Sequence, residues 1–296
     1  MIPRMKASVQ PMEVMTTGQS AAALAVRFWG VRGSIATSDP NTAKYGGNTS
    51  CLEVRCGERR LILDAGTGIR YLGRQIMAEG GKLDTDLLLT HTHFDHICGI
   101  PFFVPLFIPG NKVRIHAGHL LPEMTVKQVL TELMMAPLFP VPPEVFNAHV
   151  ECLDFEAGAQ LALGDGIVVR TAPLNHPNGA CGYRIEYDGH SVCYITDTEH
   201  ELDKRDPNVV DLCRDADVMI YDSMYTDAVH QDGKIGWGHS TWEECLRVAD
   251  AANVGTAVIF HHDPDHDDAQ MDAIAEAADK ARPGTLVARE GMVLTP

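Results

Sequence analysis

The sequence lacks three features that would each point to a particular class of protein: a long apolar run, a closely spaced cysteine pair and an excess of basic residues. No apolar stretch in the 296 residues approaches the roughly 20 that a membrane-spanning helix needs, so we expect no membrane span. The eight cysteines form no C-x-x-C pair, and several lie in apolar runs, where a free thiol packs as a small hydrophobe. A disulfide framework is therefore not expected, and the composition predicts a protein of the reducing cytoplasm.

Basic residues number 24 against 40 acidic ones, which gives a net charge of −16 with neutral histidines. Proteins bind long nucleic acids by placing cationic side chains on phosphates and releasing counterions. The small number of basic residues therefore disfavours a long RNA or DNA as partner. Part of the acidity is expected in a metal site, where bound cations would offset it.

The most informative segment is a run of histidines and carboxylates that follows the apolar residues 87–89. His91 and His93 are two residues apart, so on an extended chain their imidazoles point to the same side. Asp95 and His96 follow in the same short segment. Imidazoles and carboxylates are the ligands of zinc and similar divalent metals, so this pattern predicts a metal site.

Other polar residues stand at the ends of apolar segments that are predicted as strands. The residues in this position are Asp64, His91, His176, Asp197, Asp222 and His261. Strand ends converge on one edge of a sheet, where rigid elements can hold a site together. We therefore expect these residues to share one site.

Periodicity and turn residues predict several supporting elements. Residues 69–79 are predicted as a helix that follows a glycine-rich turn. Asp188 and Gly189 predict the turn of a hairpin over residues 183–195. Residues 285–294 are predicted to close the fold as one strand.

The order H-x-H-x-D-H from His91 to His96 resembles the metal-binding motif of the metallo-β-lactamase superfamily. Further motifs match in the family's order between about residues 25 and 296. The resemblance implies the α/β class (α+β in some schemes) and a four-layer αββα sandwich that forms a single domain over 25–296. Residues 1–24 are predicted as a flexible tail. Residues 120–150, a helix and a proline-rich apolar loop, are predicted as an insertion that could form a lid, pack on the sheet or make a dimer contact.

By resemblance, two divalent metals per chain would be held by side chains that follow the predicted strands. They are His91, His93 and His176 for the first metal, Asp95, His96 and His261 for the second, and Asp197 as the bridge. His261 is preferred to His262, because related ribonucleases read T-H-F-S-P where this chain reads F-H-H-D-P. Imidazoles and carboxylates in this proportion suit a zinc pair, with manganese or iron as alternatives.

The resemblance also implies a chemistry, in which a metal-bridging hydroxide attacks the substrate while Asp95 orients or deprotonates it. The segment G-H-S-T at 238–241 resembles branches of the superfamily that act on phosphodiesters, including tRNA 3′-processing ribonucleases and phosphoribosyl cyclic phosphate phosphodiesterases. In these the histidine contacts the phosphate or protonates the leaving oxygen. Asp222 would hold His239 and raise its pKa. Tyr221 and Asp222 depart from the H-E pair of the ribonucleases, and a surface histidine before a helix cap remains the alternative.

Loops near the start of the ordered chain offer candidates for substrate binding. Ser34, Asn48 and Thr49 lie in small, polar loops that also resemble the phosphodiesterase branch. Their N–H and hydroxyl groups could meet a phosphate. Ordinary turn chemistry explains the same residues equally well.

These observations predict a binuclear, metal-dependent phosphodiesterase acting on a small or cyclic phosphodiester. The chain shows no long exosite arm of the kind that grips tRNA, and no cysteine cluster like that of the cyclic-phosphate enzymes. A lactonase, thioesterase or β-lactamase-type hydrolase of the same fold is the first alternative, and a non-hydrolytic metal-binding or interaction protein is the second. A homodimer is compatible with the fold.

Overall fold

A computed structural model describes residues 23–202 and 204–296, which build two packed seven-stranded sheets. Across the first sheet the strands are β14 (Val293–Leu294), β1 (Leu24–Gly30), β2 (Cys51–Cys56), β3 (Arg59–Leu63), β4 (Asp84–Leu89), β5 (Lys112–Ala117) and β6 (His149–Asp154). Across the second they are β13 (Leu286–Val287), β12 (Thr256–Phe260), β11 (Val218–Asp222), β10 (His190–Ile195), β9 (Ala180–Tyr187), β8 (Ile167–Leu174) and β7 (Gln160–Gly164). The predicted tail, up to residue 22, lies outside the described residues.

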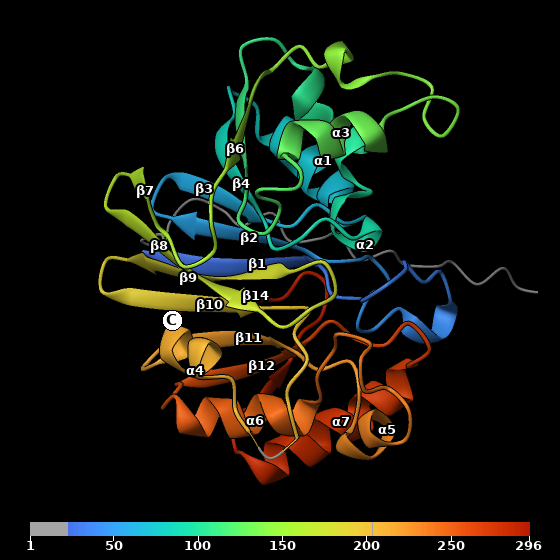
Figure 1. The fold of residues 1–296 in the computed structure, drawn as a ribbon, viewed down its shortest axis with the longest axis vertical. Coiled ribbons are helices and arrows are strands. Elements are labelled where there is room, and N and C mark those ends of the chain that lie inside the picture. Colours follow the sequence, from blue (N-terminus) through green and yellow to red (C-terminus); the bar gives the residue numbers. More distant parts are fainter. Residues whose placement is uncertain (1–22, 203) are drawn as a thin grey trace, which may run out of the picture.

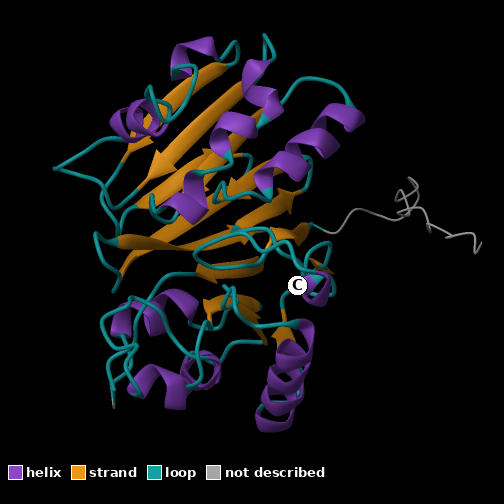
Figure 2. Cartoon of the chain, turned by 90° about the vertical axis from the view of Figure 1, so that its right-hand side faces the viewer, coloured by secondary structure: helices purple, strands orange, loops and turns teal. Residues whose placement is uncertain are grey.

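Helices cover the outer face of each sheet, so the molecule has four layers (Figures 1 and 2). The outer helices of the first sheet are α1 (Ile69–Glu79) and α3 (Val126–Leu133), and those of the second are α4 (Pro207–Cys213), α6 (Trp242–Ala251) and α7 (Asp268–Ala281). Two short helices, α2 (Phe94–Ile97) and α5 (Asp227–Gln231), interrupt the loops. The predicted αββα sandwich is therefore confirmed. None of the helices in the described part of the chain is long and apolar enough to cross a membrane.

The main apolar core lies between the two sheets and follows from the strand patterns. Strand β1 alternates buried and half-buried residues, which places Val26 and Phe28 in this core. Strands β11 and β12 are parallel to each other and almost wholly buried, as expected when helices cover one face and a sheet covers the other. Tyr183 and Tyr194 complete the core from the second sheet.

The helix at 69–79 and the hairpin around Asp188 and Gly189 are confirmed by α1 and by β9 with β10. The single closing strand at 285–294 is wrong. Its first part, β13, pairs with β12 in the second sheet, while β14 pairs with β1 in the first. Between them the N–H of Ala288 donates to Ile259 and the N–H of Gly291 donates to Phe28, so the segment crosses from one sheet to the other.

Residues 120–150 form a crossover between two neighbouring strands of the first sheet. Helix α3 buries Val126 and Leu130 in the outer core, and the chain then enters β6, which pairs in parallel with β5. The proline-rich stretch after α3 exposes Leu138, while Phe139 meets the ring of Phe102 edge-on. The helical part of this segment therefore packs on the sheet, which is one of the three alternatives predicted for it. That the segment is an insertion in a single domain stays a prediction.

A buried carboxylate ties three strands of the first sheet together. Asp86 on β4 is 1% exposed, and its oxygens accept hydrogen bonds from Arg59, Arg114 and His116 at 2.7–3.0 Å. Burial alone would raise the pKa of Asp86, but the hydrogen bonds from His116 and Arg114 outweigh it and lower this pKa. The carboxylate is therefore charged in the folded chain and compensated by the neighbouring strands.

Asp86→Asn should lower the free energy of unfolding by about 2–4 kcal/mol at pH 7, because it leaves the half-buried guanidinium groups of Arg59 and Arg114 without their charged, buried acceptor. Since the pKa of Asp86 is lowered on folding, its contribution is complete above the ordinary aspartate value and is lost as the pH falls through the lowered one. The difference in free energy of unfolding between the wild type and Asp86→Asn should therefore become smaller in acid. Denaturant unfolding at several pH values measures it. Asp84→Asn is the control, since Asp84 is 54% exposed and also contacts Arg114; an equal loss in both variants would contradict the role of burial.

Candidate metal centre

Five histidines and two aspartates gather at one edge of the sandwich, where strands of both sheets end. The residues are His91, His93, Asp95, His96, His176, Asp197 and His261. The first four follow β4, and the others follow β8, β10 and β12 in turn. Asp64, Asp197 and His261 have φ values of 55–61°, which non-glycine residues seldom adopt and which often mark functional sites.

The first group comprises His91, His93 and His176, whose nitrogen atoms lie within 4.8 Å of one another. Nε2 of His176 is 3.0 Å from Nδ1 of His93. Nε2 of His91 is buried and has no hydrogen-bond partner in the described part of the chain, although Oδ2 of Asp197 lies 3.5 Å away. A buried nitrogen with a free lone pair, facing two other imidazoles, is what a metal ligand requires.

The second group comprises Asp95, His96 and His261. Nε2 of His96 lies 3.2 Å from Oδ2 of Asp95 and 3.2 Å from Nε2 of His261. Nε2 of His261 is 3.4 Å from the same oxygen of Asp95. Three ligand atoms therefore face one point.

Asp197 lies between the two groups and presents a different oxygen to each. Its Oδ2 is 3.5 Å from Nε2 of His91 and 3.6 Å from Nε2 of His176. Its Oδ1 is 3.1 Å from Nε2 of His96 and 3.2 Å from Nε2 of His261. The carboxylate thus has the position of a bridge.

The electrostatics of the cluster suit a cation. Burial lowers the pKa of His91, His93 and His176, which favours the neutral imidazole that binds metals. Burial would also lower the pKa of His96, but Asp197 and the neighbouring carboxylates outweigh it and raise this pKa. The donor set and the unpartnered nitrogen of His91 fit divalent metals, which the fold implies.

Hydrogen bonds from outside the cluster fix the orientation of two histidines. Asp64, directly after β3, accepts from Nδ1 of His96 at 2.8 Å and from the hydroxyl of Tyr194 at 2.9 Å. It does not cap α1, whose N-cap is Gly68. Nδ1 of His176 donates to the carbonyl of Gly238 at 2.7 Å. In His96 and in His176 the hydrogen bond at Nδ1 leaves Nε2 of the same ring directed into the cluster.

His239 and Asp222 form a pair at the border of the cluster. Nδ1 of His239 lies 3.0 Å from Oδ2 of Asp222, and the imidazole stacks on that of His261 with centroids 5.1 Å apart. Burial would lower the pKa of His239, but Asp222, Asp197 and Asp95 outweigh it and raise this pKa to about 9. The structure therefore brings together the two residues predicted to act as acid and partner.

The loops predicted to bind substrate are engaged with protein groups. The N–H of Ser34 donates to Oδ2 of Asp95 at 2.8 Å, so this residue borders the cluster through its backbone. Asn48 donates from both nitrogens to the carboxylate of Glu290, and Thr49 exchanges hydrogen bonds with Thr67. These bonds hold the two loops in place, and the binding of substrate by Ser34, Asn48 and Thr49 stays a prediction.

The side chains of the two adjacent histidines that follow β12, His261 and His262, point to different parts of the molecule. His261 joins the second group, whereas Nε2 of His262 donates to the carbonyl of Ala288 at 2.7 Å. The left-handed backbone at His261 separates the two side chains.

Two supporting residues escaped the sequence analysis. Arg32 is fully buried and donates to the carbonyls of Gly46, Asp263 and His266 at 2.7–3.0 Å, which holds the loop after His261. Glu199 accepts at 2.7 Å from the N–H groups of Gly236 and Gly238, immediately before His239. Their partners lie 14–234 residues away in the chain, so no local motif marks them.

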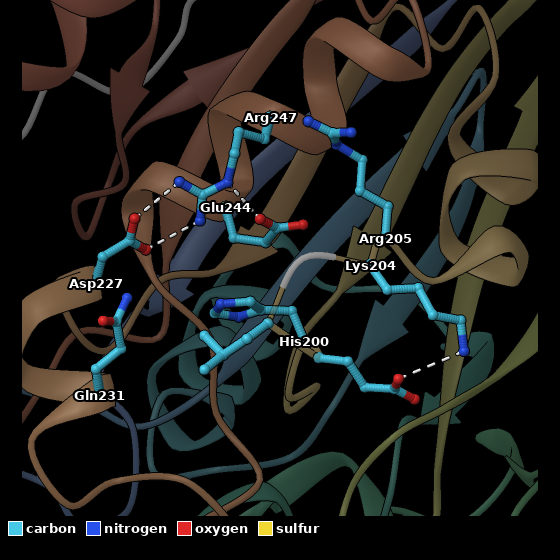
Figure 3. Close-up of a pocket in the computed structure, with 9 residues that line it drawn as sticks. His200, Lys204, Arg205, Asp227, Gln231, Glu244 and Arg247 are labelled. Atoms are coloured by element: carbon cyan, nitrogen blue, oxygen red, sulfur yellow. Dashed lines mark hydrogen bonds and ion pairs between the residues drawn. The ribbon is translucent and has the colours of Figure 1, made fainter.

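A separate cavity of about 310 Å³ lies beside the segment that carries His239 (Figure 3). His200 lines it and contacts the hydroxyl of Ser240 through Nδ1 at 2.8 Å. Arg247 is paired there with Asp227 and Glu244. None of the lining residues belongs to the metal-binding cluster.

Comparisons with known proteins agree with this arrangement. Residues 59–262 match the family model of the beta-lactamase superfamily domain. Ribonuclease Z of Mycobacterium bovis (strain BCG) is 27% identical over 238 residues, which cover 71% of this chain and 78% of that protein. The crystal structure of the metallo-beta-lactamase fold protein YhfI from Bacillus subtilis covers 92% of this chain and 98% of its own, with 20% identity and a TM-score of 0.69. A diphosphatase from the PhnP family covers 92% and 97%, with 19% identity and a TM-score of 0.66. The family match spans more than half of the chain, which therefore belongs to the beta-lactamase superfamily and has the fold of its metal-dependent hydrolases.

Proposed function

We propose that this chain is a phosphodiesterase that holds two divalent metals, zinc before manganese or iron, and hydrolyses a small or cyclic phosphodiester. The observation that carries the proposal is the pair formed by His239 and Asp222, which borders both groups of metal-binding side chains. An ester or lactone releases its leaving group with less help than a phosphodiester with a poor leaving group. A carboxylate-held imidazole beside the metals therefore favours phosphodiester chemistry.

The metals, when bound, would activate a water molecule and neutralise charge on the attacked phosphate. His91, His93 and His176 would hold the first, and Asp95, His96 and His261 the second. Asp197 supports this assignment because it presents one oxygen to each group. The N–H of Ser34 donates to Oδ2 of Asp95, the oxygen that faces His96 and His261, and so fixes this carboxylate at the second group.

The proton for the leaving oxygen would come from His239. Nδ1 of His239 donates a hydrogen bond to Asp222, and the raised pKa of about 9 keeps the imidazole cationic at neutral pH, so Nε2 carries a second proton that can be transferred. Asp222 is itself held by the N–H groups of Thr198 and Met224 at 3.2 Å. Its position, and with it the orientation of the imidazole, is fixed before substrate binds.

The relatives leave two substrate classes to compare. Ribonuclease Z is by its name an enzyme that acts on RNA, and the PhnP-family protein is a diphosphatase. The net charge of −16 favours the smaller substrate for this chain, because a long RNA would meet a predominantly acidic surface. A short RNA is the competing candidate.

His93→Ala should reduce the bound metal from about two to about one per chain and lower turnover at least 100-fold, because a direct ligand of the first group is lost. Mass spectrometry of the purified protein measures metal, and hydrolysis of bis(p-nitrophenyl) phosphate measures turnover. His149→Ala, on the exposed edge strand β6, is the control. Full metal content with normal turnover in His93→Ala would disprove the assignment.

His239→Ala should keep both metals but lose roughly 10²–10⁴-fold in rate on a diester with an alkyl leaving group. The loss on a p-nitrophenyl diester should be much smaller, because nitrophenolate departs without a proton. Asp222→Asn should follow the same pattern. Equal losses on both substrates would argue against proton donation by His239, and a retained rate on both would support a lactonase or thioesterase instead.

A substrate panel separates the candidate functions directly. We expect the metal-loaded protein to hydrolyse bis(p-nitrophenyl) phosphate and cyclic phosphates faster than lactones, thioesters or a short RNA. Initial rates at equal substrate concentration provide the comparison. Faster turnover of lactones would replace the phosphodiesterase proposal, and faster cleavage of RNA would replace the small substrate.

A further inference from the structure

We propose that Lys234 forms an anion-binding subsite on the leaving-group side of the centre, so that the substrate carries a second negative charge on its departing part. This inference rests on the proposed phosphodiesterase function. It narrows the substrate to a small diester whose leaving alcohol bears a phosphate or carboxylate group.

The position of Lys234 is set by two aromatic rings. Its ammonium lies 3.7 Å from the ring centroid of Trp237 and 5.6 Å from that of Tyr225. The ring of Tyr225 meets the imidazole of His239 edge-on, with centroids 6.1 Å apart. The ammonium is therefore connected to His239 by a single ring. Since His239 is the proposed donor to the leaving oxygen, Lys234 stands beside the path of the leaving group.

The loop that carries Lys234 also borders the metal-binding groups. Trp237 is 58% exposed and directly precedes Gly238, whose carbonyl accepts from His176. A turn between Lys234 and Trp237 is closed by a backbone hydrogen bond of 3.2 Å. An anion bound at the ammonium would therefore lie on the surface next to the first group.

The charge of Lys234 is not balanced by a nearby carboxylate. Among the described residues no carboxylate oxygen lies within 4.0 Å of its ammonium. The carboxylate of Glu199 is used by the N–H groups of Gly236 and Gly238. By contrast, Arg247 in the neighbouring cavity is paired with Asp227 and Glu244 (Figure 3). In a chain of net charge −16, an uncompensated ammonium at this place offers an anion a specific partner.

Aromatic rings hold the ammonium without pairing it with a protein oxygen. Cation–π attraction positions the charge over the ring faces, while the N–H groups that point away from the rings remain available to oxygen atoms. A phosphate or carboxylate can therefore bind without displacing a protein acceptor. An uncharged leaving group would gain nothing from Lys234.

The test compares two methyl aryl phosphates that differ only in the charge on the departing phenol. The phenol of the first carries a negatively charged carboxymethyl group, and that of the second carries the corresponding neutral carboxamide. The wild-type protein should prefer the charged diester by roughly 3–10-fold in kcat/KM, the range of a partly exposed ion pair. Lys234→Met should lose this preference and keep its rate on the neutral diester within about twofold. Lys234→Arg should retain the preference. Lys280→Met on the outer helix α7 matches the change in net charge and should behave as wild type.

The outcomes separate this inference from the function on which it rests. Normal turnover of the neutral diester with an unchanged charge preference in Lys234→Met overturns the subsite alone. An equal loss on both diesters would mean that Lys234 only stabilises its loop, which also overturns the subsite. Hydrolysis of neither diester by the metal-loaded wild-type protein, with turnover of lactones, overturns the phosphodiesterase proposal and the subsite with it.

Discussion

The carboxylate of Asp197 is the group on which the arrangement of the two sheets depends. It is 2% exposed, and its oxygens face histidines that follow strands of the first sheet as well as the second. A buried carboxylate without compensation would cost several kcal/mol, so the surrounding imidazoles and any bound cation must be held close to it. The packing of the sandwich and the geometry of the centre therefore constrain each other. A shift between the sheets would separate the two groups that Asp197 connects.

The fold could be predicted from the resemblance that the metal-binding motif carries, and the convergence of the site from short-range patterns at strand ends. The spacing of His91, His93, Asp95 and His96 is visible within six residues, and polar residues at strand ends converge in any sheet of this type. The pattern of residue types does not decide between His261 and His262 as the ligand. The choice is decided by a left-handed backbone at His261, a conformation that the side-chain type does not predict.

Other features depend on contacts between distant parts of the chain and could not be predicted. Arg32 binds carbonyl groups more than 200 residues away, and Glu199 holds the loop before His239 through backbone N–H groups, which no side-chain pattern marks. For the same reason the sequence does not reveal that polar atoms of Asn48 and Thr49 are engaged within the protein. Their partners, Glu290 and Thr67, lie in other segments and engage their polar atoms. Polar residues in glycine-rich loops are therefore poor indicators of a site until the loops are placed.

The crossing segment at the end of the chain affects the order in which the molecule can be completed. Strand β1 stands near the start of the described chain, yet one of its neighbours is β14, formed by Val293 and Leu294. A ribosome would release the partner of the first strand only after nearly all the other strands had emerged. Until then β1 presents an unpaired edge, the kind of edge that invites pairing with another chain. Closure of the first sheet therefore follows the synthesis of the other described strands, and β14 protects the edge of the earliest strand among them.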